Sequence, residues 1–405
     1  MNNIDKLIDT LRSRNIFAEY YQSGGSPAEI KDRIVDTLRP FFTNHDSLEK
    51  HAIDFLVPDY VNFNRIQAKY PGIERDIRLV LDTYAAALLK DRETLYDAIK
   101  QLIPDIIESG NRFWTFLNLE KDKALLELHE FAKESFDNLD DVIEGLMRSA
   151  LIENVIVNRI MRKKNFNIQI LKSQKLGILV DELIAHSPYA HLFSTQPEGL
   201  KLSEWRNIAA HQSYKIIGDT IVCQCGSPKS PKLLSLTRAE LYDRVLQIVR
   251  TLEVLNLSHK FFGFDNSANL TLESHEHEND SPGRDEIWLL FFVTGLNSLG
   301  FDVVQFQFKE HGEALLVVRD LTEADPKRRG IHSSQFIYPI WLFTNSTRIT
   351  VEYRLKNDDP YIRSSSTSDI CQSICNGHHD IEYLAEKVEF QVIGESQQIV
   401  PPDRR

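Results

Sequence analysis

The chain has 405 residues and a formal net charge of −12, and 42% of its residues are apolar or aromatic. This length fits two or three domains of roughly 100–200 residues each, and the apolar content excludes a globally disordered chain. The longest apolar run, 287–293, is about a third of the roughly 20 residues that a membrane span needs. No secretory signal is visible, and four cysteines are too few for a disulfide framework, so we expect a cytoplasmic protein without a membrane partner.

Residues 1–136 carry apolar side chains every three or four positions, most clearly at 4–11, 30–38 and 77–88. This period is typical of amphipathic helices. Segment 26–29 places a Ser cap, a Pro at the first helical position and a Glu at the third, which predicts a helix start. We therefore expect a helical N-terminal domain over 1–136 that serves as a scaffold or partner-binding platform.

Residues 137–258 remain helical in pattern, and the spacing predicts helices at 146–161, 176–185, 202–211 and 238–257. Four such helices must bury their apolar stripes against one another, which predicts a four-helix bundle. Between the last two helices, β-branched residues around Gly218 and Asp219 predict a short β-hairpin within 216–226.

The composition changes in the C-terminal third of the chain. It predicts a polar linker at 259–285 and a small α+β domain at 286–405. The domain begins with a predicted helix at 286–299. Predicted strands follow at 301–308, 314–319, 336–343, 348–355 and 388–393, with hairpin turns at 310–312 and 344–347. The predicted fold class is thus mainly α with a C-terminal α+β part.

The segment 203–214 holds the residues that point most directly to chemistry. If 202–211 is a helix, one apolar stripe faces the core and consists of Leu202, Trp205, Ile208 and Ala209. Arg206, Asn207 and His211 then lie on the outward side. Arg206 and His211 are separated by about 140° and about 7.5 Å of rise, so one helix alone does not aim both at one atom. A second copy across a two-fold axis would bring both types together.

This arrangement resembles the HEPN family of helical-bundle nucleotide-binding and ribonuclease domains. The resemblance spans about 137–258 and rests on an Arg, a polar residue, three further residues and a His at the end of a bundle helix, which Arg206, Asn207 and His211 match. It implies a homodimer whose paired protomers form one cleft.

Two special forms of the signature are not matched. The extended form has a Glu and a Lys four residues apart; Glu198 takes the first place, but Leu202 takes the second and Lys201 is displaced by one. A form with Tyr two residues after His is also missed, because Tyr214 stands three residues after it. The resemblance therefore extends to the general family alone.

The three residue types suit RNA cleavage by attack of the 2′-hydroxyl on the adjacent phosphate. With an unperturbed pKa of about 6.5, His211 can act as general acid or base near neutral pH. Arg206 can bind two phosphate oxygens through its planar fork, and Asn207 can orient the phosphate or ribose. The resemblance implies 2′,3′-cyclic phosphate and 5′-hydroxyl ends. It also implies a toxin or anti-phage effector that cuts tRNA or other RNA, with an antitoxin or trigger protein as a further partner.

A basic stripe without acids separates Glu153 from Asp181 in this net-acidic protein. It could hold RNA phosphates, although a solvated basic face explains it equally well. Its members are Arg159, Arg162, Lys163, Lys164, Lys172 and Lys175. The alternative to an endoribonuclease is a non-catalytic scaffold whose bundle dimerises or binds nucleotides or RNA.

Other chemistry-bearing residues favour no second site. Cys371, Cys375 and His378 lack the second ligand pair of a usual zinc site, and Cys223 and Cys225 are predicted to share one side of a strand. Segment 327–329 is predicted to be a basic loop. No phosphate loop or dinucleotide fingerprint occurs, and we expect neither a metal ion nor another cofactor.

Overall fold

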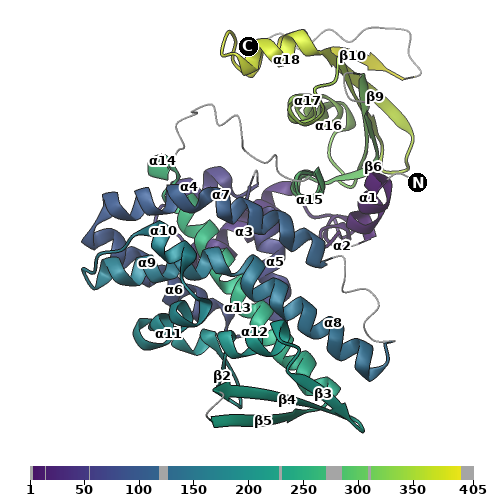
Figure 1. Ribbon diagram of the computed structural model, residues 1–405. Helices are drawn as coiled ribbons and strands as arrows, with labels where there is room; N and C mark the ends of the chain where they lie inside the picture. The colour runs from purple at the N-terminus through teal and green to yellow at the C-terminus, as the bar shows by residue number, and fades with distance from the viewer. Residues whose placement is uncertain are drawn as a thin grey trace. The chain divides into compact units, whose positions relative to one another are not determined.

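The computed structural model describes residues 3–13, 15–53, 55–117, 126–227, 230–270, 285–308 and 312–393. It is mainly helical with a C-terminal α+β part, as predicted (Figure 1). The chain divides into two compact units. Unit 1 comprises residues 1–37, 50–61 and 285–405, and unit 2 comprises 38–49 and 62–284. This division differs from the predicted boundaries, because the first helix of the chain packs with the C-terminal sheet.

The N-terminal region is a succession of helices, in agreement with its apolar period. Ser26 caps one of them: its N–H donates to Glu29 Oε2 at 2.9 Å, and the N–H of Glu29 donates to Ser26 Oγ at 3.3 Å. The predicted helix start is therefore confirmed. The helices are α1 (Asn3–Ser13), α2 (Ala18–Gln22), α3 (Pro27–Leu38), α4 (His45–His51), α5 (Val57–Lys69), α6 (Ile73–Lys90) and α7 (Arg92–Leu117), with a 3₁₀ turn η1 (Arg39–Phe41).

The rest of unit 2 is a set of helical elements that includes the four helices predicted for the central region. The members are α8 (Leu128–Asp140), the π-helical segment η3 (Asp141–Leu146), α9 (Arg148–Met161), α10 (Ile168–Ser173), α11 (Leu176–His186), the 3₁₀ turn η4 (Ala190–Phe193), α12 (Leu202–Ala210), α13 (Arg238–Asp265) and α14 (Ser267–Leu270). Helix α9 is buried along most of its length and packs against α6, α7 and α11, so it is the central helix of this unit.

Helix α13 corrects the predicted start of the linker. It continues to Asp265, past the expected end at Leu257, because Phe261 and Phe262 extend its buried face. Helix α14 follows, so the first part of the predicted linker 259–285 is helical. The remainder, 271–284, lies outside the described residues.

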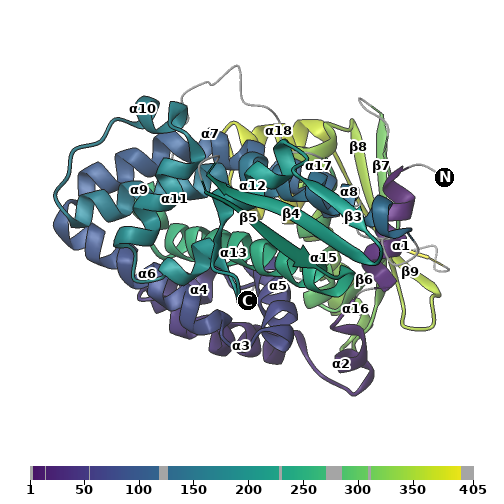
Figure 2. The same cartoon turned by 60° about the horizontal axis from the view of Figure 1, so that its bottom comes forward.

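Two small antiparallel sheets complete unit 2. The predicted hairpin is confirmed: strands β3 (Tyr214–Ile217) and β4 (Thr220–Ser227) pair across the two-residue turn Gly218–Asp219, where Gly218 has φ +57°. A third strand, β5 (Ser230–Leu236), was not predicted and pairs with β4. The sheet packs on α12 through β4 (Figure 2). The other sheet is the pair β1 (Ser194–Thr195) and β2 (Leu200–Lys201).

Unit 1 is built around a mixed five-stranded sheet in the order β10-β9-β8-β7-β6. Strands β7 and β8 are parallel and the other neighbours antiparallel, so helices must connect β7 to β8. The elements are α15 (Asp285–Ser298), β6 (Phe301–Phe308), β7 (Glu313–Asp320), α16 (Pro326–Ser333), η5 (Ser334–Phe336), α17 (Ile337–Thr344), β8 (Arg348–Arg354), β9 (Pro360–Thr367), α18 (Ser368–Cys375), α19 (Glu382–Lys387) and β10 (Glu389–Val392).

Three predictions for this unit are wrong. Segment 336–343 is helical instead of a strand, because its apolar residues fit a buried helix equally well and Pro339 lies in the first turn of α17, where a helix tolerates proline. The hairpin at 344–347 is consequently absent, since β8 pairs in parallel with β7. Segment 327–329 lies in α16, capped by Asp325, instead of in a loop. The turn predicted at 310–312 falls mostly outside the described residues.

The core of unit 1 lies between the sheet and its helices. Helix α1 contributes Ile8 and packs on β6 and α15, whereas α17 contributes Ile337 and Ile340. Helices α16 and α17 lie against the sheet at β8 and β9 (Figure 1). Within the described ranges, no helix has the length and apolar character needed to cross a membrane.

A buried ion pair in unit 2 joins α9 to α13. His259 Nδ1 lies 2.9 Å from Glu153 Oε1, and the Glu153 side chain is 2% exposed. Burial lowers the pKa of His259, but the charge and hydrogen bond of Glu153 outweigh it, so the pKa is raised. A raised pKa in the folded state means that the pair stabilises the fold below about pH 6.5 and loses this contribution as pH rises through the folded pKa.

We expect Glu153→Gln to lower the free energy of unfolding by about 2 kcal/mol at pH 6, because a charge-assisted hydrogen bond is lost. The difference from wild type should shrink as pH rises through the folded-state pKa of His259, because the imidazole then loses its charge. Urea unfolding followed by circular dichroism at several pH values measures this difference. Glu134→Gln, on the exposed side of α8, is the control. A difference that is constant with pH would contradict the titration of this pair.

Candidate functional site

Helix α12 carries the candidate catalytic residues and is held in place by its apolar stripe. Leu202, Trp205, Ile208 and Ala209 are all buried, as the sequence predicted. At its first turn, Glu204 accepts a hydrogen bond from the backbone N–H of Lys201 at 3.0 Å. Helix α12 packs against α8, α11 and η3, which fixes the direction of its outward side.

The outward side of α12 presents the predicted site residues. Asn207 and His211 are exposed, and their side chains form no hydrogen bond or ion pair with any residue that the structure describes. His211 ends the helix: its backbone N–H donates to the Asn207 carbonyl at 3.1 Å, and the chain then turns at Gln212 (φ +47°). The imidazole is therefore open to solvent.

Arg206 is less exposed and lies between two carboxylates. Its Nε atom is 3.6 Å from Asp140 Oδ1, at the end of α8, and 3.4 Å from Glu144 Oε2, in η3. The Arg206 side chain is 32% exposed. Burial raises the pKa of Asp140, and the positive charge of Arg206 opposes this shift in part. No hydrogen bond or ion pair joins Arg206 to His211 within the single chain. The prediction that a second copy completes the site is not tested by the structure of one chain.

Two further residues weighed for the signature have partners elsewhere. Glu198 binds Arg244 through both carboxylate oxygens at 2.8 Å, and this hydrogen bonding lowers the pKa of Glu198. Lys201 Nζ lies 2.7 Å from Asp181 Oδ1. Both ion pairs connect elements of unit 2, so these residues stabilise the packing around α12.

The predicted basic stripe divides into paired and exposed members. Arg159 and Arg162 both bind Glu182 on α11, and the hydrogen bond from Arg159 lowers the pKa of Glu182. Lys172 Nζ lies 2.5 Å from Asp105 Oδ2. The exposed members, for which the structure gives no partner among described residues, are Lys163, Lys164 and Lys175.

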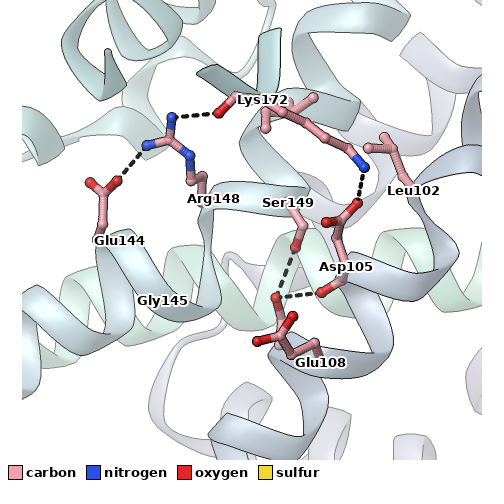
Figure 3. Close-up of a pocket in the computed structure, with 10 residues that line it drawn as sticks. Leu102, Asp105, Glu108, Glu144, Gly145, Arg148, Ser149 and Lys172 are labelled. Carbon is pink, nitrogen blue, oxygen red and sulfur yellow. Dashed lines mark hydrogen bonds and ion pairs between the residues drawn. The ribbon is translucent and has the colours of Figure 1, made fainter. Parts of the chain in front are cut away.

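A pocket of about 180 Å³ opens beside this network, between α7, η3, α9 and α10 (Figure 3). Arg148 lies on its wall, where it binds Glu144 and donates to the carbonyl of Lys172 at 3.1 Å. Ser109 Oγ and Ser149 Oγ, which also line the pocket, are 3.1 Å apart. Glu144 therefore belongs both to the pocket lining and to the surroundings of Arg206.

The sequence interpretation missed Asp140 and Glu144. Their signal was a ladder of charges four residues apart, Asp140, Glu144 and Arg148, which places three side chains on one helix face. That ladder does not reveal that α12 brings Arg206 against it.

Among the residues that the structure describes, no group of three or more His, Cys, Asp or Glu side chains lies close enough together to bind a metal ion. Cys371 is buried and Cys375 exposed on α18. Burial raises the pKa of the Cys223 thiol to about 12, and Cys225 is also buried.

The chain matches no family model, no curated protein and no solved structure.

Proposed function

We propose that this protein is a metal-independent endoribonuclease of the HEPN type that acts as a homodimer. The observation that carries the proposal is the outward side of α12, where Arg206, Asn207 and His211 emerge from a helix whose other side is fully buried. An exposed imidazole and a guanidinium on the outward side of one helix supply a proton carrier and a phosphate ligand, which a second copy of the chain would bring together. A toxin or anti-phage effector in the cytoplasm is the role proposed for this activity.

In the proposed reaction, the 2′-oxygen of RNA forms a bond to the adjacent phosphorus as the bond to the 5′-oxygen breaks. His211 acts as general acid and base: it accepts the 2′-hydroxyl proton, and the imidazolium that forms returns a proton, through solvent water, to the departing 5′-oxygen. Arg206 neutralises the developing negative charge, and Asn207 orients the phosphate or ribose. The exposed Lys163, Lys164 and Lys175 would hold neighbouring phosphates of the RNA.

The proposal is tested by incubating the purified full chain with total RNA, and with a defined RNA oligonucleotide, in the presence and absence of EDTA. We expect cleavage that EDTA does not reduce. The fragments should have 5′-hydroxyl ends, which polynucleotide kinase labels directly, and 2′,3′-cyclic phosphate ends. Cleavage that needs added Mg²⁺, or fragments with 5′-phosphates, would contradict this mechanism.

The second candidate is a scaffold whose bundle dimerises or binds RNA or nucleotides without catalysis. One observation favours it, since Arg206 already has two carboxylates close to it in the structure. Binding of RNA without cleavage in the same assay would support this candidate.

A further inference from the structure

Two carboxylates contact Arg206 from the same edge of its guanidinium. The closest approach of both Asp140 and Glu144 is to Nε, at 3.6 and 3.4 Å. Nε and the two facing oxygens are buried and have no hydrogen-bond partner among the described residues. The contact is therefore an ion pair of three groups without a directional hydrogen bond.

The terminal nitrogens of Arg206 remain available. They donate no hydrogen bond to any residue in the described part of the chain, although a guanidinium has five N–H donors. The carboxylates thus engage the Nε edge and leave the terminal fork, which can bind two oxygens of a phosphate in bidentate fashion.

Glu144 is itself held in place. Its other oxygen binds Arg148, whose guanidinium also donates to the carbonyl of Lys172 (Figure 3). The same guanidinium donates to the carbonyl of Gln174. A four-group chain therefore runs from Arg148 through Glu144 and Arg206 to Asp140, with two positive and two negative charges. Glu144 lies in the π-helical segment η3, and such segments are frequent at functional sites.

We propose that Asp140 and Glu144 are positioning residues that hold Arg206 by Nε and direct its fork toward an RNA phosphodiester. The inference rests on the proposed function. A long side chain binds its target best when a fixed partner already orients it. Residues that hydrogen-bond to a metal ligand and fix its direction act in the same way. A carboxylate pair that only blocked Arg206 would be expected to engage its terminal nitrogens.

Kinetics of cleavage of a defined RNA oligonucleotide test the role. Asp140→Ala and Glu144→Ala should each lower kcat about tenfold with little change in KM, because orientation matters most in the transition state. Glu144→Gln should retain an intermediate kcat, since its amide oxygen can still face Nε. In an Arg206→Ala background, neither alanine substitution should lower kcat further.

Two features keep this test decisive. Glu144→Ala also removes a partner of Arg148 and could destabilise the bundle, whereas the ion pair found for the Asp140 side chain is with Arg206, so Asp140→Ala is the cleaner variant. Asp141→Asn, an exposed acid in the same η3 segment, is the matched control and should leave kcat unchanged. A rise in kcat in Asp140→Ala would overturn positioning and identify the carboxylates as a block.

A spectroscopic readout separates this inference from the proposed function. The ¹⁵N–¹H signal of Arg206 Nε, identified by its loss in Arg206→Lys, should move to the position of exposed arginines in Asp140→Ala. RNA methylated at every 2′-oxygen can bind but not react, and it should shift this signal more in wild type than in Asp140→Ala. If wild type cuts no RNA but shows these shifts, the proposed ribonuclease activity is contradicted, whereas the positioning of Arg206 by the two carboxylates is supported. If the methylated RNA leaves the signal unchanged, positioning fails.

Discussion

His211→Ala is expected to reduce RNA cleavage at least about a hundredfold, because a positioned acid or base typically contributes 10²- to 10⁴-fold to a rate. The imidazole is exposed at the end of α12 and contributes no described contact to the fold, so the variant should unfold as wild type does. Initial rates on a defined RNA oligonucleotide measure the loss. His186→Ala, an exposed histidine at the end of α11, is the matched control and should keep full activity.

Arg206→Ala should produce a loss of similar size, and Arg206→Lys should recover little of it, because an ammonium cannot bind two phosphate oxygens in the same plane. Arg78→Ala, which removes a surface arginine paired with Glu74, is the control. If both site variants cut RNA as well as wild type, the catalytic assignment of α12 is wrong.

Mixing the two inactive variants tests the two-subunit site. If one protomer supplies the guanidinium and its partner the imidazole, a heterodimer of Arg206→Ala and His211→Ala contains one complete site. Activity should then rise on mixing. Continued inactivity of a verified heterodimer would show that each subunit needs its own pair.

Asp320→Ala is expected to destabilise unit 1 by about 3–5 kcal/mol, the cost of leaving a buried charge without its partner. Asp320 and Arg329 have side chains only 4% and 8% exposed, with Arg329 Nε 3.1 Å from Asp320 Oδ2. The carboxylate also accepts hydrogen bonds from the hydroxyl of Tyr353 at 2.7 Å and from the N–H of Thr322 at 2.9 Å. One substitution therefore removes the acceptor of five N–H and O–H donors, which belong to Thr322, Arg329 and Tyr353.

Hydrogen exchange of peptides from β7 and β8, measured by mass spectrometry, localises this loss, and urea unfolding gives its size. Glu323→Ala is the control, because its ion pair with Lys356 is largely exposed and should contribute less than about 1 kcal/mol. Equal effects of the two substitutions would contradict the role assigned to Asp320.

Local features of the fold were predictable from sequence where a repeating pattern determines the structure. The stripe from Leu202 to Ala209 identified both the helix and its buried side, and Gly218–Asp219 identified the hairpin. Segment 336–343 could not be assigned from its period, because a short and almost wholly apolar segment fits a strand and a buried helix equally well. The three serines at 364–366 concealed β9, since they are buried although polar.

The sequence predicted only the part of the candidate site that lies on α12. Spacing placed Arg206, Asn207 and His211 on the outward side of α12. Their neighbours depend on how α12 packs against α8 and η3, which no local pattern specifies. The contacts of Asp140 and Glu144 with Arg206, and the pairing of Arg159 and Arg162 with Glu182, therefore emerged only from the structure.

The packing of α1 on β6 and α15 has a consequence for synthesis on the ribosome. Ile8 leaves the ribosome before its partners in β6, which follow almost three hundred residues later. At about 5–20 residues per second, the nascent helix waits roughly 15–60 s for them. During that interval the apolar side of α1 has no native partner from the C-terminal sheet, so it is an exposed amphipathic segment of the kind that chaperones bind.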